Sequence, residues 1–479
     1  MKAILKTKQG MALVVIIMVM LILLSITGAG LLFSGLDLKT TSQHRTGTTA
    51  FYATEAGLSH AWRELENGDG VNDFATVFSS GATAVSPFSV TSFGGGSYTV
   101  TALAVVGSNP NRVKVTSTGC LPAGNPCPSG NSKAVIEAEF KKESGKPNKA
   151  IVVNGDLKIS GGPSIMGTRG GAHTNEDMEV SGSPGIQMAD GLTASNKTTN
   201  DGGIHDGMKV SGSPCIGSSQ CSLPPGQQPD ANKIDTADER NAYEAAHNSA
   251  SQETIPKINP ADYAPKVAAM GANHYILHDN GTVTTGPGVT CGTDGLCSGG
   301  TSVVPVPAGW EFEGGKWKVD DDSAANGVFY SEVKVEVSGS PGSSGSPWQA
   351  TIIARDDIKI SSGPHIKPYP TTSDDLKNHL LVTGNDLEIS GSMTADYAGG
   401  AILVHQQFKI SSSAKINGFI IAGDGQPTWT GDPFTNSGSG VSKNEISGSA
   451  TITYNADFDC FGPGCLPATV KLVTWREVF

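Results

Sequence analysis

Positive charge and aromatic side chains are scarce in this sequence. Its 479 residues carry 33 Lys and Arg against 45 Asp and Glu, a formal net charge of -12, and only 6% are aromatic. Nucleic-acid binding needs clustered Lys and Arg to neutralise phosphates, so DNA and RNA are not expected partners. Glycine, in contrast, reaches 61 residues. This composition is typical of strands and turns, and the length implies about three domains.

Motifs of common catalytic sites are also absent. The chain has no GxSxG turn, no P-loop, no Gly-rich dinucleotide fingerprint and no HExxH zinc motif. His274 and His278 are four residues apart, about 13 Å along a strand, and so cannot share a metal ion. We therefore expect no catalytic residues, no enzyme activity, no cofactor and no metal.

Cysteine is present as four close pairs. These are Cys120 with Cys127, Cys215 with Cys221, Cys291 with Cys297, and Cys460 with Cys465. Local bridges are the simplest pairing, and each would stabilise the fold by roughly 2 kcal/mol on the loop-entropy model. Metal binding is disfavoured because no pair has CxxC spacing, and free thiols are the remaining alternative. Disulfides indicate an oxidising compartment.

An uncharged apolar run at residues 11–33 is long enough to span a bilayer. Lys2, Lys6 and Lys8 precede it, which places the N-terminus in the cytoplasm and the bulk of the chain outside. A cleaved secretory signal peptide, with a small-residue site at 27–30, is the alternative, but the apolar run continues past that site.

The helical pattern continues beyond the membrane run. Positions on one helical stripe of residues 50–65 are occupied by Phe51, Thr54, Leu58, Trp62 and Leu65. We therefore predict one helix over residues 11–67, half in lipid and half amphipathic.

Two stretches of this region resemble a known family. The basic leader, residues 1–10, ends in Gly10 before Met11 and is similar to a prepilin-peptidase site, and "FYATEAGL" at 51–58 resembles the helix signature of PilX-type minor pilins. That family belongs to type IV pilus assembly and is related to the K-type minor pseudopilins of type II secretion. The resemblance covers under a third of the chain. It implies cleavage between Gly10 and Met11, and an uncleaved membrane anchor is the alternative.

Val15 stands where major pilins carry a glutamate, five residues after the cut. A carboxylate within a membrane costs a few kcal/mol unless it is paired. In pilins, the resemblance implies pairing with a neighbouring subunit's terminal ammonium. A subunit without the acid cannot make that contact and is suited to a filament tip.

Beyond the helix, two further regions are predicted. Residues 68–142 contain alternating apolar segments between Gly, Pro and Asn, which indicates a small antiparallel strand-rich unit against the helix. Residues 143–149 resemble a linker, and residues 150–479 are predicted to form a parallel β-helix, or β-solenoid. The expected fold class is therefore mainly β with a long pilin-like N-terminal helix.

A ten-residue motif, such as "DMEVSGSPGI" at 177, recurs eight times between residues 156 and 452. Copies 20 to 36 residues apart with β-branched strands are typical of a stacked solenoid. The gap of 127 residues between the third and fourth copies predicts an insertion at about 217–330, looped out of one continuous stack.

The outward residue of each copy alternates in charge along the chain. In chain order these residues are Lys158, Glu179, Lys209, Glu336, Lys359, Glu388, Lys409 and Glu445. Copies stacked about 4.8 Å apart would place opposite charges side by side, each pair contributing about 0.2–1 kcal/mol. Since a slip by one coil would place like charges together, we expect this charge ladder to set the register.

Aspartates at the motif entries leave two interpretations open. Asp156, Asp177, Asp357 and Asp386 either form a line of cation ligands or, as we favour, cap turns through Asx hydrogen bonds. The acidic stretch at 319–327 is a second, weaker calcium candidate.

These features favour a structural function. We expect a minor pilin-like component of a type IV pilus or related secretion filament, displaying a β-solenoid at or near the tip for assembly or adhesion. Expected partners are the bacterial inner membrane, prepilin peptidase, other minor pilins with the assembly machinery, and a surface or polysaccharide ligand. The protein would be single-pass before assembly and on the pilus or cell surface afterwards. A membrane-anchored β-helix that binds or cleaves polysaccharide, or a pilus-independent surface protein, is the alternative.

Overall fold

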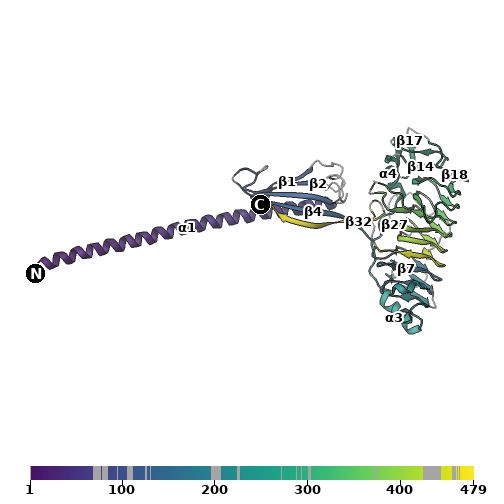
Figure 1. Ribbon diagram of the computed structural model, residues 1–479, viewed down its shortest axis with the longest axis horizontal. Helices are drawn as coiled ribbons and strands as arrows, with labels where there is room; N and C mark the ends of the chain where they lie inside the picture. The colour runs from purple at the N-terminus through teal and green to yellow at the C-terminus, as the bar shows by residue number, and fades with distance from the viewer. Residues whose placement is uncertain are drawn as a thin grey trace. The chain divides into compact units, whose positions relative to one another are not determined.

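The computed structural model confirms the predicted fold class: a long N-terminal helix, a small antiparallel sheet and large parallel sheets that form a β-solenoid (Figure 1). The chain divides into two compact units, residues 1–143 with 469–479, and residues 144–468. The structure describes residues 2–67, 77, 85–93, 95–104, 112–124, 127–129, 131–195, 207–223, 227–270, 272–286, 288–292, 294–299, 304–371, 373, 375–423, 444–455, 460, 462 and 464–478.

The first unit combines one helix with a five-stranded antiparallel sheet. Helix α1 spans Lys2–Asn67, so the leader residues from Lys2 onward continue the helix. The strands, in sheet order, are β1 (Val85–Phe93), β2 (Gly96–Ala104), β3 (Arg112–Leu121), β4 (Ser132–Gly145) and β32 (Leu466–Glu477). The final strand corrects the predicted solenoid boundary of 150–479: the C-terminus returns to the small sheet. Arg476 there donates to the Glu137 carboxylate of β4 at 2.6 and 3.0 Å.

Glycine allows α1 to lie directly on the sheet. A Cβ on Gly119 of β3 would fall 2.2 Å from the Ala50 carbonyl oxygen of the helix, closer than atoms can approach. At the same level the Ser117 hydroxyl donates to the Thr54 carbonyl at 2.8 Å, and the Thr54 hydroxyl reaches the Ala134 carbonyl at 3.2 Å. Close packing and buried hydrogen bonds thus fix the C-terminal part of the helix to its own sheet.

Each regular solenoid coil has three short strands, one on each of three faces. The coil of β6 (Leu157–Ile159), β7 (Ser164–Met166) and β8 (Ala172–Thr174) is an example. The first face is a ten-stranded sheet, in order β12 (Met208–Gly212), β9 (Met178–Gly182), β6, β30 (Asn444–Ile446), β28 (Phe408–Ile410), β26 (Leu387–Ile389), β23 (Ile358–Ile360), β21 (Val335–Val337), β19 (Lys316–Val319) and β18 (Trp310–Glu313).

A fifteen-stranded sheet supplies the other two faces in the part of the chain that the structure describes. Its main path is β13 (Cys215–Ile216), β10 (Gly185–Ile186), β7, β31 (Thr451–Thr453), β29 (Lys415–Ala422), β27 (Thr394–Val404), β25 (His379–Thr383), β22 (Trp348–Ala354), β20 (Gly327–Ser331), β14 (His274–Leu277) and β15 (Val283–Thr284). Off this path lie β5 (Ile151–Val153), β8, β11 (Leu192–Ala194) and β24 (Ile366–Lys367).

The coils do not stack in chain order. On the first face β6, the first motif copy, pairs in parallel with β30, the last copy, and β5 and β7 likewise pair with β29 and β31. In Figure 1 the blue strands of the first coils accordingly continue the green and yellow stack. The third copy, β12, ends the sheet instead of joining the fourth, β21. The order of the coils in space is therefore a circular permutation of their order in the chain. The coils of the first three motif copies extend the stack beyond the coil of the last copy.

A return segment at residues 250–269 carries the chain back along the stack. The Ala250 N–H donates to the Ala194 carbonyl beside β11, and farther on His405 Nδ1 lies 2.8 Å from the Ile258 carbonyl oxygen, to which it donates. Ile258, Tyr263 and Val267 of this segment are fully buried. Because it covers the outward apolar residues of the third face, strands there are buried on both sides, as in β22 and β25.

Both ends of the stack are closed by non-repeating structure. Helix α3 (Ala237–His247) lies against β12, where the Glu244 carboxylate accepts the Val210 N–H at 2.6 Å and Arg240 donates to the Gly212 carbonyl at 3.0 Å. At the other end, the antiparallel hairpins β18–β19 and β14–β15 finish two faces, and α4 (Ala264–Ala269) and the β16 (Val289–Cys291)–β17 (Cys297–Gly299) hairpin lie nearby. At the β12 end, the Glu244 and Arg240 contacts occupy backbone groups that a further coil would otherwise pair with.

The charge ladder survives this permutation with one neighbour changed. Its spatial order is Lys209, Glu179, Lys158, Glu445, Lys409, Glu388, Lys359 and Glu336, extended by Lys318. Ion pairs join Lys359 Nζ to Glu388 at 2.9 Å and Lys158 Nζ to Glu179 at 3.4 Å. The predicted neighbours Lys209 and Glu336 are wrong: their strands are seven spacings, roughly 34 Å, apart.

The region 217–330 is likewise not an insertion looped out of a continuous stack. It contains the cap helix, the return segment and strands β14, β18, β19 and β20, which are members of the solenoid sheets. The segment is long because the chain must pass from the β12 end of the stack to the opposite end. There it forms the terminal strands β14, β18, β19 and β20 before the fourth motif copy.

Carbodiimide cross-linking of the purified full chain should distinguish the two orders. We expect a zero-length cross-link between Lys158 and Glu445, whose strands are adjacent, and none between Lys209 and Glu336. Peptide mass spectrometry identifies the products. Glu445→Gln should remove the Lys158–Glu445 cross-link, together with any cross-link to the other neighbour of Glu445, Lys409. A Lys209–Glu336 product within one chain would contradict the permuted order.

Candidate assembly helix and buried polar sites

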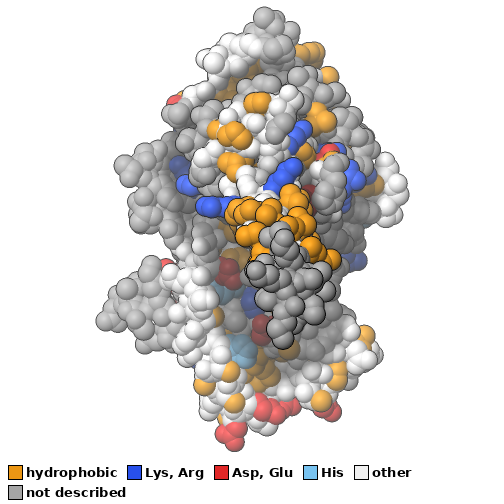
Figure 2. Space-filling model, turned by 90° about the vertical axis from the view of Figure 1, so that its left-hand side faces the viewer, with side chains coloured by type: hydrophobic (Ala, Val, Ile, Leu, Met, Phe, Trp, Pro, Cys, Tyr) orange, Lys and Arg blue, Asp and Glu red, His pale blue; other side chains and the backbone are white. Residues whose placement is uncertain are grey.

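The N-terminal part of α1 is apolar and uncovered. Among the described residues, one helix is long and apolar enough to cross a membrane, and none of its most apolar window is buried. Val15, at the position of the missing glutamate, is 54% exposed, and Phe33 is also exposed. In the end-on view of Figure 2, hydrophobic side chains gather around the described part of α1. Residues 14–33 extend about 30 Å, the thickness of a bilayer core.

Farther along α1, the predicted apolar stripe is only partly covered. Thr54 and Leu65 are buried, whereas Trp62 is 42% exposed. Trp62 lies beside a groove of about 430 Å³ between the helix and strands β4 and β32, lined by Glu55, Leu58, Ser59, Trp62, Ile136, Phe140, Leu472 and Trp475. The C-terminal strand, which sequence analysis placed in the solenoid, thus forms one wall of this groove.

All eight cysteines are in disulfides that join the pairs indicated by their spacing: Cys120–Cys127, Cys215–Cys221, Cys291–Cys297 and Cys460–Cys465. Each bridge closes a short loop. Together with the apolar helix, the disulfides favour an extracytoplasmic location for the two folded units.

The motif aspartates cap the backbone of adjacent coils. Asp177 Oδ1 accepts the Gly207 N–H at 2.7 Å, and Asp386 Oδ1 accepts the Gln407 N–H at 3.1 Å. Asp357 Oδ1 accepts the Asp386 N–H at 3.3 Å, and burial together with the neighbouring Asp356 raises the pKa of Asp357. These carboxylates hold consecutive coils in register. Their donors belong to the next coil, so the favoured interpretation, Asx hydrogen bonds that cap turns within one motif copy, is wrong in the partner.

The weaker calcium candidate at 319–327 is also engaged with backbone. Asp321 Oδ1 accepts the Ser323 N–H, and Asp322 Oδ1 accepts the Ser340 N–H, both at 3.0 Å. These hydrogen bonds describe a turn that is tied to the following coil.

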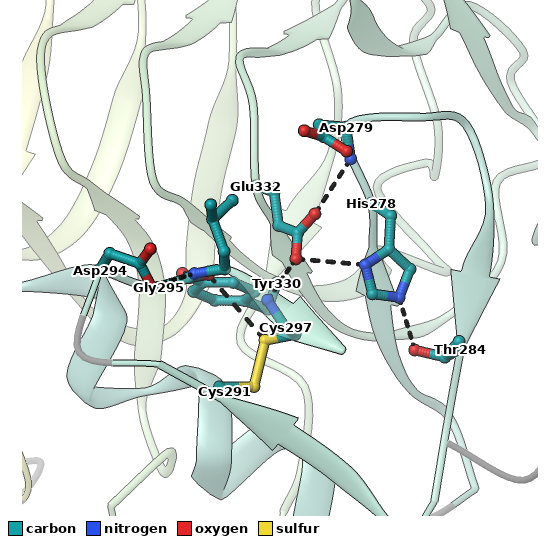
Figure 3. The surroundings of a disulfide bond; sticks show 10 residues. His278, Asp279, Thr284, Cys291, Asp294, Gly295, Cys297, Tyr330 and Glu332 are labelled. Atoms are coloured by element: carbon teal, nitrogen blue, oxygen red, sulfur yellow. Dashed lines mark hydrogen bonds and ion pairs between the residues drawn. A yellow bond between two sulfur atoms is a disulfide. The ribbon is translucent and has the colours of Figure 1, made fainter. Parts of the chain in front are cut away.

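A buried His–Glu pair lies beside the Cys291–Cys297 disulfide (Figure 3). His278 Nδ1 is 3.1 Å from Glu332 Oε1, and His278 Nε2 is 2.8 Å from the Thr284 hydroxyl. The Glu332 carboxylate also accepts the N–H groups of Cys297, at 2.6 Å, and of Asp279, at 3.1 Å. Glu332 is 4% exposed. One carboxylate therefore ties the disulfide hairpin and the β14–β15 turn to strand β20.

The electrostatics of Glu332 follow from these contacts. Burial acts to raise its pKa, but the hydrogen bonds from His278, Cys297 and Asp279 together bring the pKa below the ordinary glutamate value of 4.5. The folded structure thus stabilises the ionised carboxylate of Glu332 relative to the neutral acid. His274, the other histidine of β14, instead places Nδ1 2.9 Å from the Ala272 carbonyl, so the two histidines have separate partners.

Sequence analysis missed Asn444, which marks the junction of the last coil with the first. It takes the inward position that Leu157, Leu387 and other apolar residues fill in their copies, and it is fully buried. Its Oδ1 accepts the Phe408 N–H at 3.2 Å, and its Nδ2 donates to the Asp156 carbonyl at 3.1 Å. In the sequence, Asn444 is the one polar residue at the first inward position of the eight motif copies, and this exception could have indicated the junction.

No protein-family model and no curated protein matches the sequence. Among solved structures, the chain is similar to the crystal structure of the competence-associated pilin ComZ from Thermus thermophilus, with 16% identity and a TM-score of 0.30, over 90% of this chain and 97% of that chain. A similarity of this degree transfers no role to residues of this chain. The PilX-type assignment stays a prediction, while the pilin-like arrangement of a long apolar helix packed on a small antiparallel sheet is present.

Proposed function

We propose that this chain is a minor pilin-like structural subunit of a type IV pilus or related secretion filament, and that its β-solenoid is displayed at or near the tip for assembly or surface adhesion. The observation that carries the proposal is the division of α1. Its C-terminal part packs on the chain's own sheet, whereas residues 14–33 are exposed and apolar. An uncovered helix of this length needs lipid before assembly and neighbouring helices afterwards.

The tip position rests on Val15. A subunit that lacks the membrane glutamate offers no carboxylate to the terminal ammonium of a neighbour, so many internal copies would leave unpaired charges in an apolar filament core. The expected partners are the inner membrane, prepilin peptidase, other minor pilins and the assembly machinery.

The proposal is non-enzymatic. Glycoside cleavage needs two carboxylates about 5–10 Å apart that face substrate. The ladder glutamates instead stack beside lysines, as in Lys359–Glu388, and motif aspartates such as Asp177 accept backbone N–H groups. The solenoid would contribute a rigid surface that binds a partner or a surface polysaccharide.

Cleavage at the leader provides the test. In a host with active prepilin peptidase, we expect mature protein that begins at Met11, and Gly10→Val should leave it starting at Met1 and absent from sheared filaments. Mass spectrometry of the N-terminal peptide and of the filament fraction measures both. Gly345→Val is the matched control, because Gly345 lies outside α1 and a Cβ there meets no atom within 4 Å.

Two outcomes would contradict the proposal. Wild-type protein that still begins at Met1 would favour a plain membrane anchor. Abundance in the filament close to that of the major subunit would contradict the tip position.

A further inference from the structure

Three buried side chains able to bind a metal ion converge on strand β25, away from the surfaces discussed above. His379 Nε2 lies 3.4 Å from Cys465 Sγ and 3.8 Å from Cys460 Sγ, and all three ligand atoms are within 4.8 Å of one another. The three residues are 0%, 6% and 1% exposed, in that order. In the structure the two sulfurs form a disulfide.

The histidine is oriented as a ligand. His379 Nδ1 lies 3.2 Å from the Lys377 carbonyl oxygen, which can only accept, so Nδ1 carries the proton. Nε2 is then the acceptor of the ring: it accepts from the Tyr263 hydroxyl at 3.1 Å and faces the two sulfurs. Metal binding would require that hydroxyl to release the Nε2 lone pair. A backbone carbonyl that fixes the tautomer in this way is the usual support of metal-binding histidines.

The cysteine spacing also differs from that of the other pairs. Cys460 and Cys465 are five positions apart, whereas the other pairs are six or seven apart. A C-x4-C segment falls within the range of C-x2 to C-x4 that zinc sites use. The four intervening residues, Phe-Gly-Pro-Gly, are of the kind that favours turns.

We propose that the dithiol form of Cys460 and Cys465, together with His379, binds one soft closed-shell cation, Zn²⁺ or Cu⁺. Two thiolates and one imidazole suit both ions, and the two thiols lose two protons on binding. Cu⁺ is satisfied by three ligands, whereas Zn²⁺ takes a fourth, for which the Tyr263 hydroxyl is adjacent. Disulfide and metal exclude each other because both use the same sulfur atoms.

Either state would join the same three segments of the solenoid. Tyr263 belongs to the return segment, His379 to strand β25, and the cysteines to the loop that precedes β32. A metal bound before the thiols are oxidised would hold these segments together. This inference is independent of the proposed pilin-like function.

The test uses the full chain in detergent. A water-soluble phosphine reduces each disulfide to two thiols and becomes the phosphine oxide with oxygen from water. After anaerobic desalting, Zn²⁺ and Cu⁺ are titrated in separate arms against chromophoric chelators. We expect one tightly bound ion per chain that depends on this site, lost in Cys460→Ser/Cys465→Ser and bound about 10–100-fold more weakly in His379→Gln. The matched control, Cys291→Ser/Cys297→Ser, should keep it.

A second measurement reads the ligand set directly by absorption spectroscopy. Co²⁺ added to the reduced Cys291→Ser/Cys297→Ser chain should give thiolate charge-transfer and tetrahedral ligand-field bands, and His379→Gln in that background should shift the ligand-field bands. Circular dichroism verifies that each variant is folded. Absence of a tight ion, or an affinity and a spectrum unchanged in folded His379→Gln, overturns the proposal.

Discussion

Gly391→Ala is expected to destabilise the solenoid by about 3 kcal/mol or more, the upper range for overpacking. A Cβ at this position would lie 1.7 Å from the Ser362 carbonyl oxygen of the neighbouring coil. The backbone has little freedom to move away, because the preceding strand β26 is paired with β23 on one side and β28 on the other. The Ser-Gly-Ser corner is therefore required by the stacking of backbone on backbone.

Denaturant unfolding of the full chain in detergent, followed by far-UV circular dichroism, measures this loss. Gly345→Ala is the matched control, since a Cβ there meets no atom within 4 Å. We expect that control to stay within about 0.5 kcal/mol of wild type. Equal behaviour of the two variants would show that the corner has room for a side chain.

Glu332→Gln should have the second largest effect, a loss of about 3 kcal/mol. The substitution keeps the shape of the side chain but leaves His278 beside a neutral amide and weakens the acceptor for two backbone N–H groups (Figure 3). Breaking one partner of a buried pair costs about 3–5 kcal/mol, and the remaining amide oxygen offsets part of this. Hydrogen exchange at Cys297 and Asp279 should accelerate most, because their N–H groups donate to this carboxylate.

The pH dependence of stability checks the same site. The pKa of Glu332 is lower in the folded protein than its ordinary value of 4.5, so its contribution is complete above about pH 4.5 and is lost as pH falls through the folded pKa. The difference in Tm between wild type and Glu332→Gln should therefore be constant near neutral pH and shrink below pH 4.5. The exposed Glu311→Gln serves as the control. A difference that stays constant down to pH 3 would contradict an ionised Glu332.

Much of this protein could be predicted from local patterns. The uncharged run at 11–33, the stripe that continues to Leu65 and the close cysteine pairs report local geometry, because helical periodicity and short loops involve neighbours in the chain. The solenoid was predictable for the same reason: β-branched inward residues recur on either side of one charged position, as in Ile358, Lys359 and Ile360.

The order of the coils was decided only by the tertiary structure. A ladder that begins with Lys158 and ends with Glu445 alternates equally well whether Lys209 meets Glu336 or the two ends meet each other, so charge could not choose between them. The choice depends on backbone groups at the ends of the stack. Arg240 and Glu244 of α3 occupy the free edge of β12, while Asn444 bonds across to Asp156 at the junction. Contacts between residues this distant in sequence leave no periodic signal, and the return of the last strand to the small sheet was missed for the same reason.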